Sequence, residues 1–242
     1  METMIITATA MFLASLVMGL TGFGFAMVGI GIMSMCVPIK TIIPFIFPYN
    51  VLMNSVLIWQ LKAHLSVARV IPQLLFFLPG GLVGSLLLVH WADASLKVMV
   101  GITLVGFSLW GLIQPEPILS RSSTLWSGIA GFSAGLLGGA LYMPGPPVIV
   151  YNTAIASDQF QFKVDLQLFF LFTNIFLLFG YASLGLFSCH SLKMTLYYSP
   201  CIALGLFAGL LIFRKLTHRK FKAVSTLVLA CLGAGILART LL

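Results

Sequence analysis

A run of prolines and glycines inside a long apolar stretch constrains this chain more than any other feature. Residues 138–147 read GGALYMPGPP, with Pro144, Pro146 and Pro147 within four positions. Proline has no N–H to donate and its ring clashes with the preceding turn, so this run cannot continue a regular helix. Within hydrocarbon, backbone groups freed by such a break must be covered by protein or line a watery cavity. The run therefore predicts an interrupted membrane helix, which is typical of transporter sites.

The composition indicates a chain built for a lipid bilayer. Of its 242 residues, 60% are hydrophobic and 7% are charged, whereas a soluble domain has about 25% charged residues. These charges are too few to cover a soluble surface, so we expect an all-α polytopic membrane protein. The net charge of +8 fits loop anchors of membrane helices, and no basic run with polar groove-readers indicates nucleic acid binding.

Eight apolar stretches approach or exceed the length of a membrane crossing, which takes about 20 residues. The first and fifth are the longest, and we expect both to be interrupted at their glycine and proline motifs. The expected crossings are residues 4–37, 42–61, 70–89, 98–114, 125–151, 166–187, 194–213 and 223–241.

The two halves of the sequence resemble each other, which predicts an internal repeat. The first four-helix copy would cover residues 1–114, residues 115–124 would be a linker, and the second copy would cover 125–242. Four crossings per copy is an even number, so the copies would point the same way across the bilayer. Chance matching of glycines is the alternative. The matched pairs are Gly19/Gly135 and Gly22/Gly138 at an offset of 116, Asn54/Asn174 at 120, and Gly80/Gly205, Gly84/Gly209 and Lys97/Lys222 at 125.

Glycines mark both expected interruptions. Gly22 and Gly24 lie in the first long stretch, and Gly138 and Gly139 lie in the fifth. If the helix breaks there, the half-helix that follows presents free N–H groups and a positive dipole end, which together bind anions. The alternative is that glycines only permit close helix packing. We favour packing for Gly80/Gly84 and Gly205/Gly209, and a binding site for the interrupted motifs.

Amide side chains inside the apolar stretches supply further candidates. Asn54 and Asn174 lie within the second and sixth crossings, and a buried amide in hydrocarbon needs partners. These two could donate hydrogen bonds to an anion or clamp the broken backbone, and both readings stay open. Tyr151 and Asn152 offer donors just after the prolines. Weaker candidates are Thr21, Ser34, Tyr142 and Thr173.

Fixed charge is absent from the interiors of the crossings. Each Asp, Glu, Lys or Arg lies at the end of a crossing or in a connection. Lys163 would attract an anion at the mouth of a pathway, or form an interfacial ion pair with Asp165. A pathway lined by amide and backbone donors suits an anion better than a cation. No enzyme motif and no Cys/His ligand spacing occurs, so we expect no catalysis, metal or cofactor.

At these residues the chain resembles the sulfite exporter TauE/SafE family of membrane proteins. The resemblance rests on GLTGFGF at 19–25, on GLLGG with the PGPPVIVY run at 135–151, and on FKVDLQLFF at 162–170. It implies export or exchange of small, often sulfur-containing anions at a bacterial inner (plasma) membrane. Two positions depart from the family pattern. The family usually shows GxGG followed by GGPP, whereas Tyr142, Met143 and Pro144 precede Gly145 here, and it often has Arg at the position of Lys163. Positions matching its motifs are Gly22, Gly24, Gly138, Gly139, Gly145, Pro146, Pro147 and Lys163.

The sequence thus predicts a transporter that exports or exchanges a small anion, such as sulfite or an organosulfonate, by alternating access. A non-transporting membrane assembly or partner protein and a passive anion channel remain the alternatives. The oligomeric state is open, with a homodimer among the options.

Overall fold

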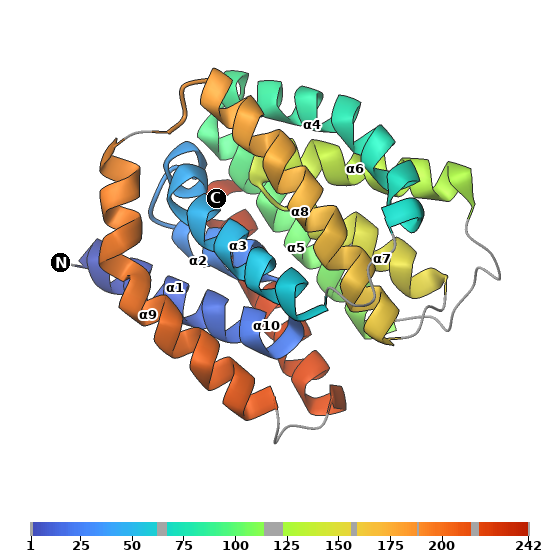
Figure 1. Ribbon diagram of the computed structural model, residues 1–242. Coiled ribbons are helices and arrows are strands. Elements are labelled where there is room, and N and C mark those ends of the chain that lie inside the picture. Colours follow the sequence, from blue (N-terminus) through green and yellow to red (C-terminus); the bar gives the residue numbers. More distant parts are fainter. Residues whose placement is uncertain are drawn as a thin grey trace. The chain divides into compact units, whose positions relative to one another are not determined.

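The computed structural model describes residues 2–61, 67–113, 123–155, 159–187, 189–213 and 218–241. Within these ranges the secondary structure is helical and no strand occurs, which confirms the all-α prediction (Figure 1). The elements are α1 (Glu2–Thr21), α2 (Phe25–Met33), α3 (Ile39–Leu61), the short 3-10 helix η2 (Val67–Arg69), α4 (Ile71–His90), α5 (Asp93–Ile113), α6 (Thr124–Leu141), α7 (Gly145–Ala154), α8 (Gln159–Ser183), α9 (Cys189–Phe213) and α10 (His218–Leu241).

Five stretches among the described residues are long and apolar enough to cross a membrane. They cover α4, α5, α6 and most of α8 and α9. Shorter apolar stretches occupy Met4–Leu20 in α1 and Leu229–Thr240 in α10. The chain is therefore a polytopic membrane protein by length and composition of its helices, and the expected total of eight crossings stays a prediction.

The first expected interruption lies between α1 and α2. The backbone at Gly22 and Gly24 has φ angles of 80° and 94°, a region that side chains with a Cβ rarely adopt. Helix α1 ends at Thr21, and α2 starts at Phe25. The prediction that the first long stretch is interrupted at its glycines is confirmed.

The second expected interruption lies between α6 and α7, although not at Gly138 and Gly139, which stay helical. Tyr142 ends α6 in the left-handed region, with φ 56°, and the prolines follow directly. Pro146 and Pro147 fall in the first turn of α7, where proline is tolerated because those positions have no intrahelical acceptor for an N–H. The proline run therefore starts a new helix.

Contacts divide the chain into two compact units, each described by itself below. Unit 1 comprises Met1–Pro48, Ala92–Gln114 and Phe187–Leu242, and unit 2 comprises Tyr49–Trp91 and Pro115–Leu186. The division falls within α3, directly after Pro48. Each unit draws on both predicted repeat copies, so the units are not the copies.

In unit 1, α2 folds back along α1. A Cβ added at Gly29 would stand 3.4 Å from Met11 Cε and 3.6 Å from Ala14 Cβ. If α2 continued in line with α1, Met11 and Gly29 would be about 27 Å apart at 1.5 Å per residue. The interruption therefore reverses the chain and produces a helical hairpin.

In unit 2, α6 and α7 form a second hairpin. Asn152 of α7 accepts a hydrogen bond of 2.9 Å from the Gln73 amide of α4. A Cβ added at Gly131 of α6 would stand 2.9 Å from the Gln73 carbonyl carbon. Gly131 and Asn152 therefore approach the same residue, whereas in a straight broken helix they would lie about 30 Å apart.

Glycine faces join two pairs of parallel helices. In unit 2, Gly80 and Gly84 of α4 leave no room for a Cβ against the carbonyl oxygens of Phe132 and Leu136 in α6 (Figure 1). In unit 1, Gly205 and Gly209 of α9 meet the carbonyl oxygens of Phe12 and Leu16 in α1 in the same manner. The packing role predicted for these four glycines is confirmed.

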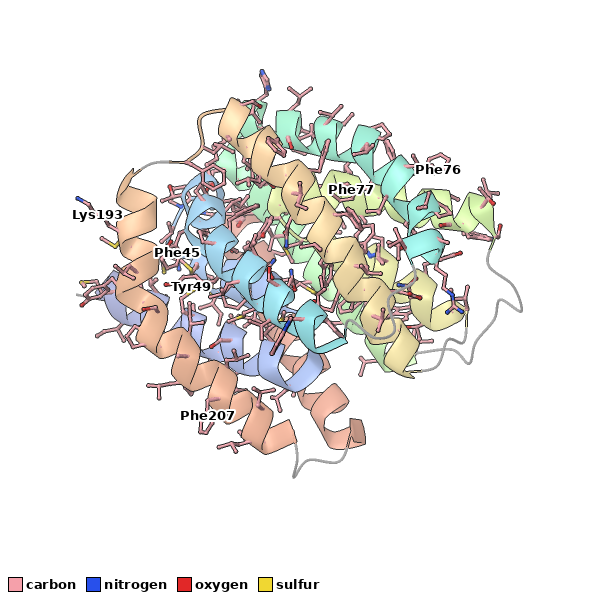
Figure 2. All side chains as sticks on the ribbon, viewed as in Figure 1. Phe45, Tyr49, Phe76, Phe77, Lys193 and Phe207 are labelled. Carbon is pink, nitrogen blue, oxygen red and sulfur yellow. The ribbon has the colours of Figure 1, made fainter. Side chains whose placement is uncertain are left out.

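Aromatic rings pack between α4 and α8 in unit 2. Phe77 of α4 is buried and meets Phe169 and Phe176 of α8 edge to face, with ring centroids 5.6 and 5.8 Å apart. Its neighbour Phe76 points outward and is exposed (Figure 2). This alternation separates an inward face of α4 from a face suited to lipid.

Unit 1 also contains an antiparallel helix pair, α5 and α10. Gly101 of α5 lies against Leu237 of α10, whereas Val105 lies against Gly233. Residue numbers that increase along α5 meet residue numbers that decrease along α10, so the two helices run in opposite directions.

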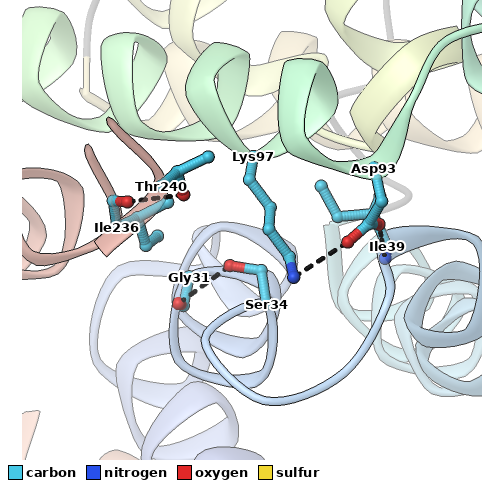
Figure 3. Close-up of polar contacts among 7 residues, drawn as sticks. All are labelled: Gly31, Ser34, Ile39, Asp93, Lys97, Ile236 and Thr240. Carbon is cyan, nitrogen blue, oxygen red and sulfur yellow. Dashed lines mark hydrogen bonds and ion pairs between the residues drawn. The ribbon is translucent and has the colours of Figure 1, made fainter. Parts of the chain in front are cut away.

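A polar link fastens the start of α3 to α5 in unit 1. The Asp93 carboxylate accepts a 2.8 Å hydrogen bond from the backbone N–H of Ile39, and its other oxygen pairs with Lys97 at 2.8 Å (Figure 3). A carboxylate at a helix N-terminus satisfies a donor that has no acceptor within the helix.

Candidate functional site

The end of α6 in unit 2 gathers polar side chains from three helices. We call Asn50 and Asn54 of α3, Tyr142 at the end of α6, and Asn174 of α8 the amide cluster. Asn54 and Tyr142 have no exposed surface, and Asn174 is 4% exposed. Buried polar groups at this density need an explanation, because each costs free energy unless it is hydrogen-bonded.

Tyr142 connects the cluster. Its hydroxyl donates a 2.9 Å hydrogen bond to Asn174 Oδ1, and the Asn50 side chain is hydrogen-bonded to Tyr142 as well. The left-handed backbone at Tyr142 turns its side chain away from the path of α6, at a conformational cost of about 1–2 kcal/mol for a residue with a Cβ. The buried hydroxyl bonds hold the ring there.

Asn54 belongs to the same neighbourhood through helix geometry. It lies four residues after Asn50 on α3, and residues four apart lie one above the other on the same helix face. Since Asn50 contacts Tyr142, Asn54 stands one helical turn, about 5–6 Å, from that contact. Asn174 bonds Tyr142 directly, whereas Asn54 lies one helical turn along α3 from the residue that meets Tyr142.

Three polar atoms of the cluster have no hydrogen-bond partner. These are Nδ2 and Oδ1 of Asn54 and Nδ2 of Asn174. An unsatisfied buried polar group costs about 1–3 kcal/mol, so three together mark a place for water or a polar ligand. Two of the three are N–H donors, the groups that an anion requires.

Tyr181 of α8 closes the end of α6 beside the cluster. Its hydroxyl donates to the carbonyl oxygens of Gly138 and Gly139 at 2.7 and 2.9 Å. The Gly138 carbonyl also accepts the Tyr142 N–H at 2.9 Å. The Gly139 carbonyl is one of the last carbonyls of the helix, which have no intrahelical donor, and Tyr181 supplies one. Its ring meets that of Tyr142 at a centroid distance of 6.2 Å. The interruption is thereby clamped by side chains rather than left open.

A second polar pair in unit 2 joins α4 to α7. Gln73 donates to Asn152 Oδ1, while Gln73 Oε1 and Asn152 Nδ2 remain without partners. Gln73 and Asn152 are 3% and 4% exposed. This pair repeats the pattern of the amide cluster, in which one hydrogen bond fixes the amide and leaves its other polar atom available.

The N-terminus of α7 is a weaker anion site than its position predicts. Pro144, Pro146 and Pro147 have no N–H, and the N–H of Met143 donates to Leu137 O at 3.2 Å. Of the residues 143–147, Gly145 alone can offer an N–H to a ligand. In this half of the chain, side-chain amides therefore offer more free N–H donors to an anion than the backbone does.

The remaining predicted residues are placed as follows. Gly22 and Gly24 lie in the interruption of unit 1. A Cβ at Gly139 would clash with the backbone of Gly81 and Ser85, so close packing against α4 requires this glycine. Gly138 faces Phe77 and Pro144, and Gly145 faces Phe170. Tyr151 is buried. Lys163 lies in α8, and its side chain is outside the described residues.

Two residues that form buried hydrogen bonds near the site, Tyr181 and Gln73, were not predicted from the sequence. Tyr181 lies seven residues after Asn174, which places it on the same face of α8. Gln73 is the one amide side chain in the apolar stretch 70–89. Both signals exist in the sequence, but neither indicates which backbone group or side chain the residue meets.

These features define a class of protein. It is a polytopic helical membrane protein with two helical hairpins formed at interruptions of apolar stretches and a buried, uncharged polar cluster beside one of them. Within the described residues, no group of three or more His, Cys, Asp or Glu side chains gathers.

The chain belongs to the sulfite exporter TauE/SafE family of membrane transporters, whose family model matches residues 7–236. The match covers nearly the whole chain and confirms the resemblance drawn from its motifs. Searches of curated proteins and of solved structures found no match.

Proposed function

We propose that the protein exports or exchanges a small anion, sulfur-containing as the family description suggests, and that the amide cluster binds it. The observation that carries this proposal is the set of unpaired N–H donors on Asn54 and Asn174 at a fully buried position. Hydrogen bonds from neutral donors to a charged group contribute about 1.5–3 kcal/mol each. Such bonds would hold an anion without a fixed countercharge, and weakly enough for release.

The contacts support an internal repeat with a register different from the expected one. Gly84 meets Gly139 and Gly209 meets Gly19 at 3.0 and 3.1 Å, so Gly19 corresponds to Gly139, at an offset of 120. The helix starts agree: α2 and α7, and likewise α3 and α8, begin 120 positions apart, and α5 and α10 begin 125 apart. This register replaces the Gly19/Gly135 match at 116.

The repeat copies in this proposal are inverted, not parallel. Equivalent helices that pack antiparallel, as α5 and α10 do, are related by a twofold axis perpendicular to them. In a membrane protein that axis lies in the membrane plane. The expectation of parallel copies treated each hairpin as one crossing. When the two helices of each hairpin are counted separately, a copy has five helices. An odd number of helices makes the two copies point in opposite directions. Inverted repeats commonly underlie alternating access, the transport mode that we propose here.

Flux measurements on asparagine-to-aspartate variants test the proposal. Asn174→Asp keeps the oxygen that accepts from Tyr142 but replaces the unpaired Nδ2 donor with a carboxylate oxygen. Asn54→Asp likewise replaces the unpaired Nδ2 donor of Asn54 with a carboxylate oxygen. In proteoliposomes loaded with sulfite, methanesulfonate or acetate, each variant should lower flux of the transported anion about tenfold or more, the equivalent of one lost charged hydrogen bond.

Thr103→Val is the matched control, because the Thr103 hydroxyl bonds only its own helix at Met99 O, 2.7 Å away. Its flux should equal that of the unchanged protein. Folded protein that moves none of the three anions would contradict the proposal and favour a partner protein. Flux that does not saturate with anion concentration would favour a channel.

A further inference from the structure

We infer that the site admits only singly charged anions, so that a diprotic oxyanion such as sulfite is carried in its half-protonated form, hydrogensulfite. The inference rests on the proposed function and specifies the substrate of the same site. It follows from three properties of the amide cluster: no Lys or Arg lies within seven positions of its residues along the sequence, its unpaired atoms on Asn54 and Asn174 are buried, and it offers an unpaired acceptor together with its donors.

The first property is the absence of Lys and Arg within seven positions of each cluster residue along the sequence. No Lys or Arg occurs in residues 49–61, 70–91, 122–157 or 166–186. Among the basic groups of unit 2, Arg69 and His90 are exposed at helix ends, and the side chain of Lys163 in α8 lies outside the described residues. Asp165 is buried in α8 at 5% exposure, and its own charge would repel an anion rather than attract one.

The second property is burial, which makes charge number decisive. The free energy of moving an ion from water into a medium of low dielectric constant grows with the square of its charge, so a dianion costs roughly four times as much as a monoanion. The hydrogen bonds that can offset this cost do not grow in the same proportion, because the cluster has a fixed number of donors. A neutral amide site therefore discriminates strongly against dianions.

The third property is the mixed character of the unpaired atoms. Asn54 leaves both its N–H donor and its carbonyl oxygen without partners, and Asn174 leaves a donor. A fully ionised oxyanion can only accept hydrogen bonds, so it would leave Asn54 Oδ1 unsatisfied. An oxyanion that keeps one acidic O–H accepts from both amides and donates to that oxygen, which satisfies the whole set.

The experiment uses the unaltered protein in proteoliposomes and measures sulfite flux from about pH 6 to pH 9 in two series, with flux through protein-free vesicles subtracted. One series holds total sulfite constant, and the other holds hydrogensulfite constant. We expect flux to fall in the first series once the pH exceeds the second ionisation of the acid, by about tenfold per pH unit, and to stay level in the second.

Sulfate and methanesulfonate, as competitors of sulfite flux, provide an independent readout. Methanesulfonate is singly charged throughout the range and should inhibit, although less than its charge alone predicts, because it has no O–H to donate to Asn54 Oδ1. Sulfate is doubly charged and should not inhibit. Flux that follows the dianion concentration, or sulfate inhibition equal to that by methanesulfonate, would overturn the inference while leaving anion transport intact. Absence of flux for all anions would instead remove the proposed function itself.

Discussion

At the scale of single residues, Tyr142 determines how the second interruption is built. It adopts a backbone conformation that favours glycine, and in the repeat register that we propose its counterpart in the first hairpin is Gly22. The second hairpin accepts this conformational cost and gains a hydroxyl that fixes Asn174. An outlier held in place by buried hydrogen bonds is typical of functional positions.

Replacing Tyr142 with Phe should destabilise the protein by about 1–3 kcal/mol, because Asn174 Oδ1 would lose its donor while staying buried. The midpoint of thermal unfolding in detergent measures this, and flux should fall because Asn174 is then free to turn. Tyr197→Phe is the control, since Tyr197 is 63% exposed, and it should leave the midpoint unchanged. Equal midpoints for the two variants would show that the Tyr142 hydroxyl holds nothing.

At the scale of helices, glycine faces decide which elements can touch. The contact between α4 and α6 depends on backbone approaching backbone, and the same arrangement recurs between α1 and α9. Without a hydrophobic drive between helices in lipid, such close approach supplies the van der Waals contact that holds them together. A single Cβ at these positions should therefore matter more than a larger change elsewhere.

Gly80→Ala should cost about 1–3 kcal/mol, as expected when a methyl group is forced into a filled contact. Its Cβ would collide with the Phe132 carbonyl, whereas a Cβ at Gly106 of α5 meets nothing within 4 Å. Gly106→Ala should instead stabilise by up to about 1 kcal/mol through helix propensity. Thermal unfolding of both variants checks this pair, and a Gly80→Ala protein as stable as Gly106→Ala would argue against tight α4–α6 packing.

At the scale of the whole molecule, the direction of each helix follows from how many times the chain reverses. Two hairpins add two reversals that a count of long apolar stretches misses. The inverted relation that we propose for the copies rests on this count and on the antiparallel pairing of α5 with α10. It predicts that equivalent positions of the two copies face opposite sides of the membrane.

Single cysteines at Met4 and Thr124, which lie 120 positions apart at the starts of α1 and α6, should react with a membrane-impermeant thiol reagent from opposite sides. The background protein would have its native cysteines replaced by serine or alanine. Ile113→Cys, at the end of α5, should react from the same side as Thr124→Cys, because only a short segment separates them. Labelling of Met4→Cys and Thr124→Cys from one side would restore the parallel arrangement.

The sequence by itself determined that the first and fifth apolar stretches are interrupted and that Asn54 and Asn174 are buried. These properties are local: glycine and proline fix the backbone torsions at 22–24 and 142–147, and an asparagine within twenty apolar residues has no route to water. The family assignment also follows from local motifs, and the family model match confirms it.

Only the tertiary structure decided that each interruption reverses the chain, because a helix break does not specify the direction in which the next helix leaves. The partners of the amides were equally beyond local pattern. Tyr181 reaches Gly138 from 43 positions away, and Gln73 meets Asn152 across 79. Such pairs form because burial leaves each polar atom with a few possible partners, and packing of the whole unit selects among them.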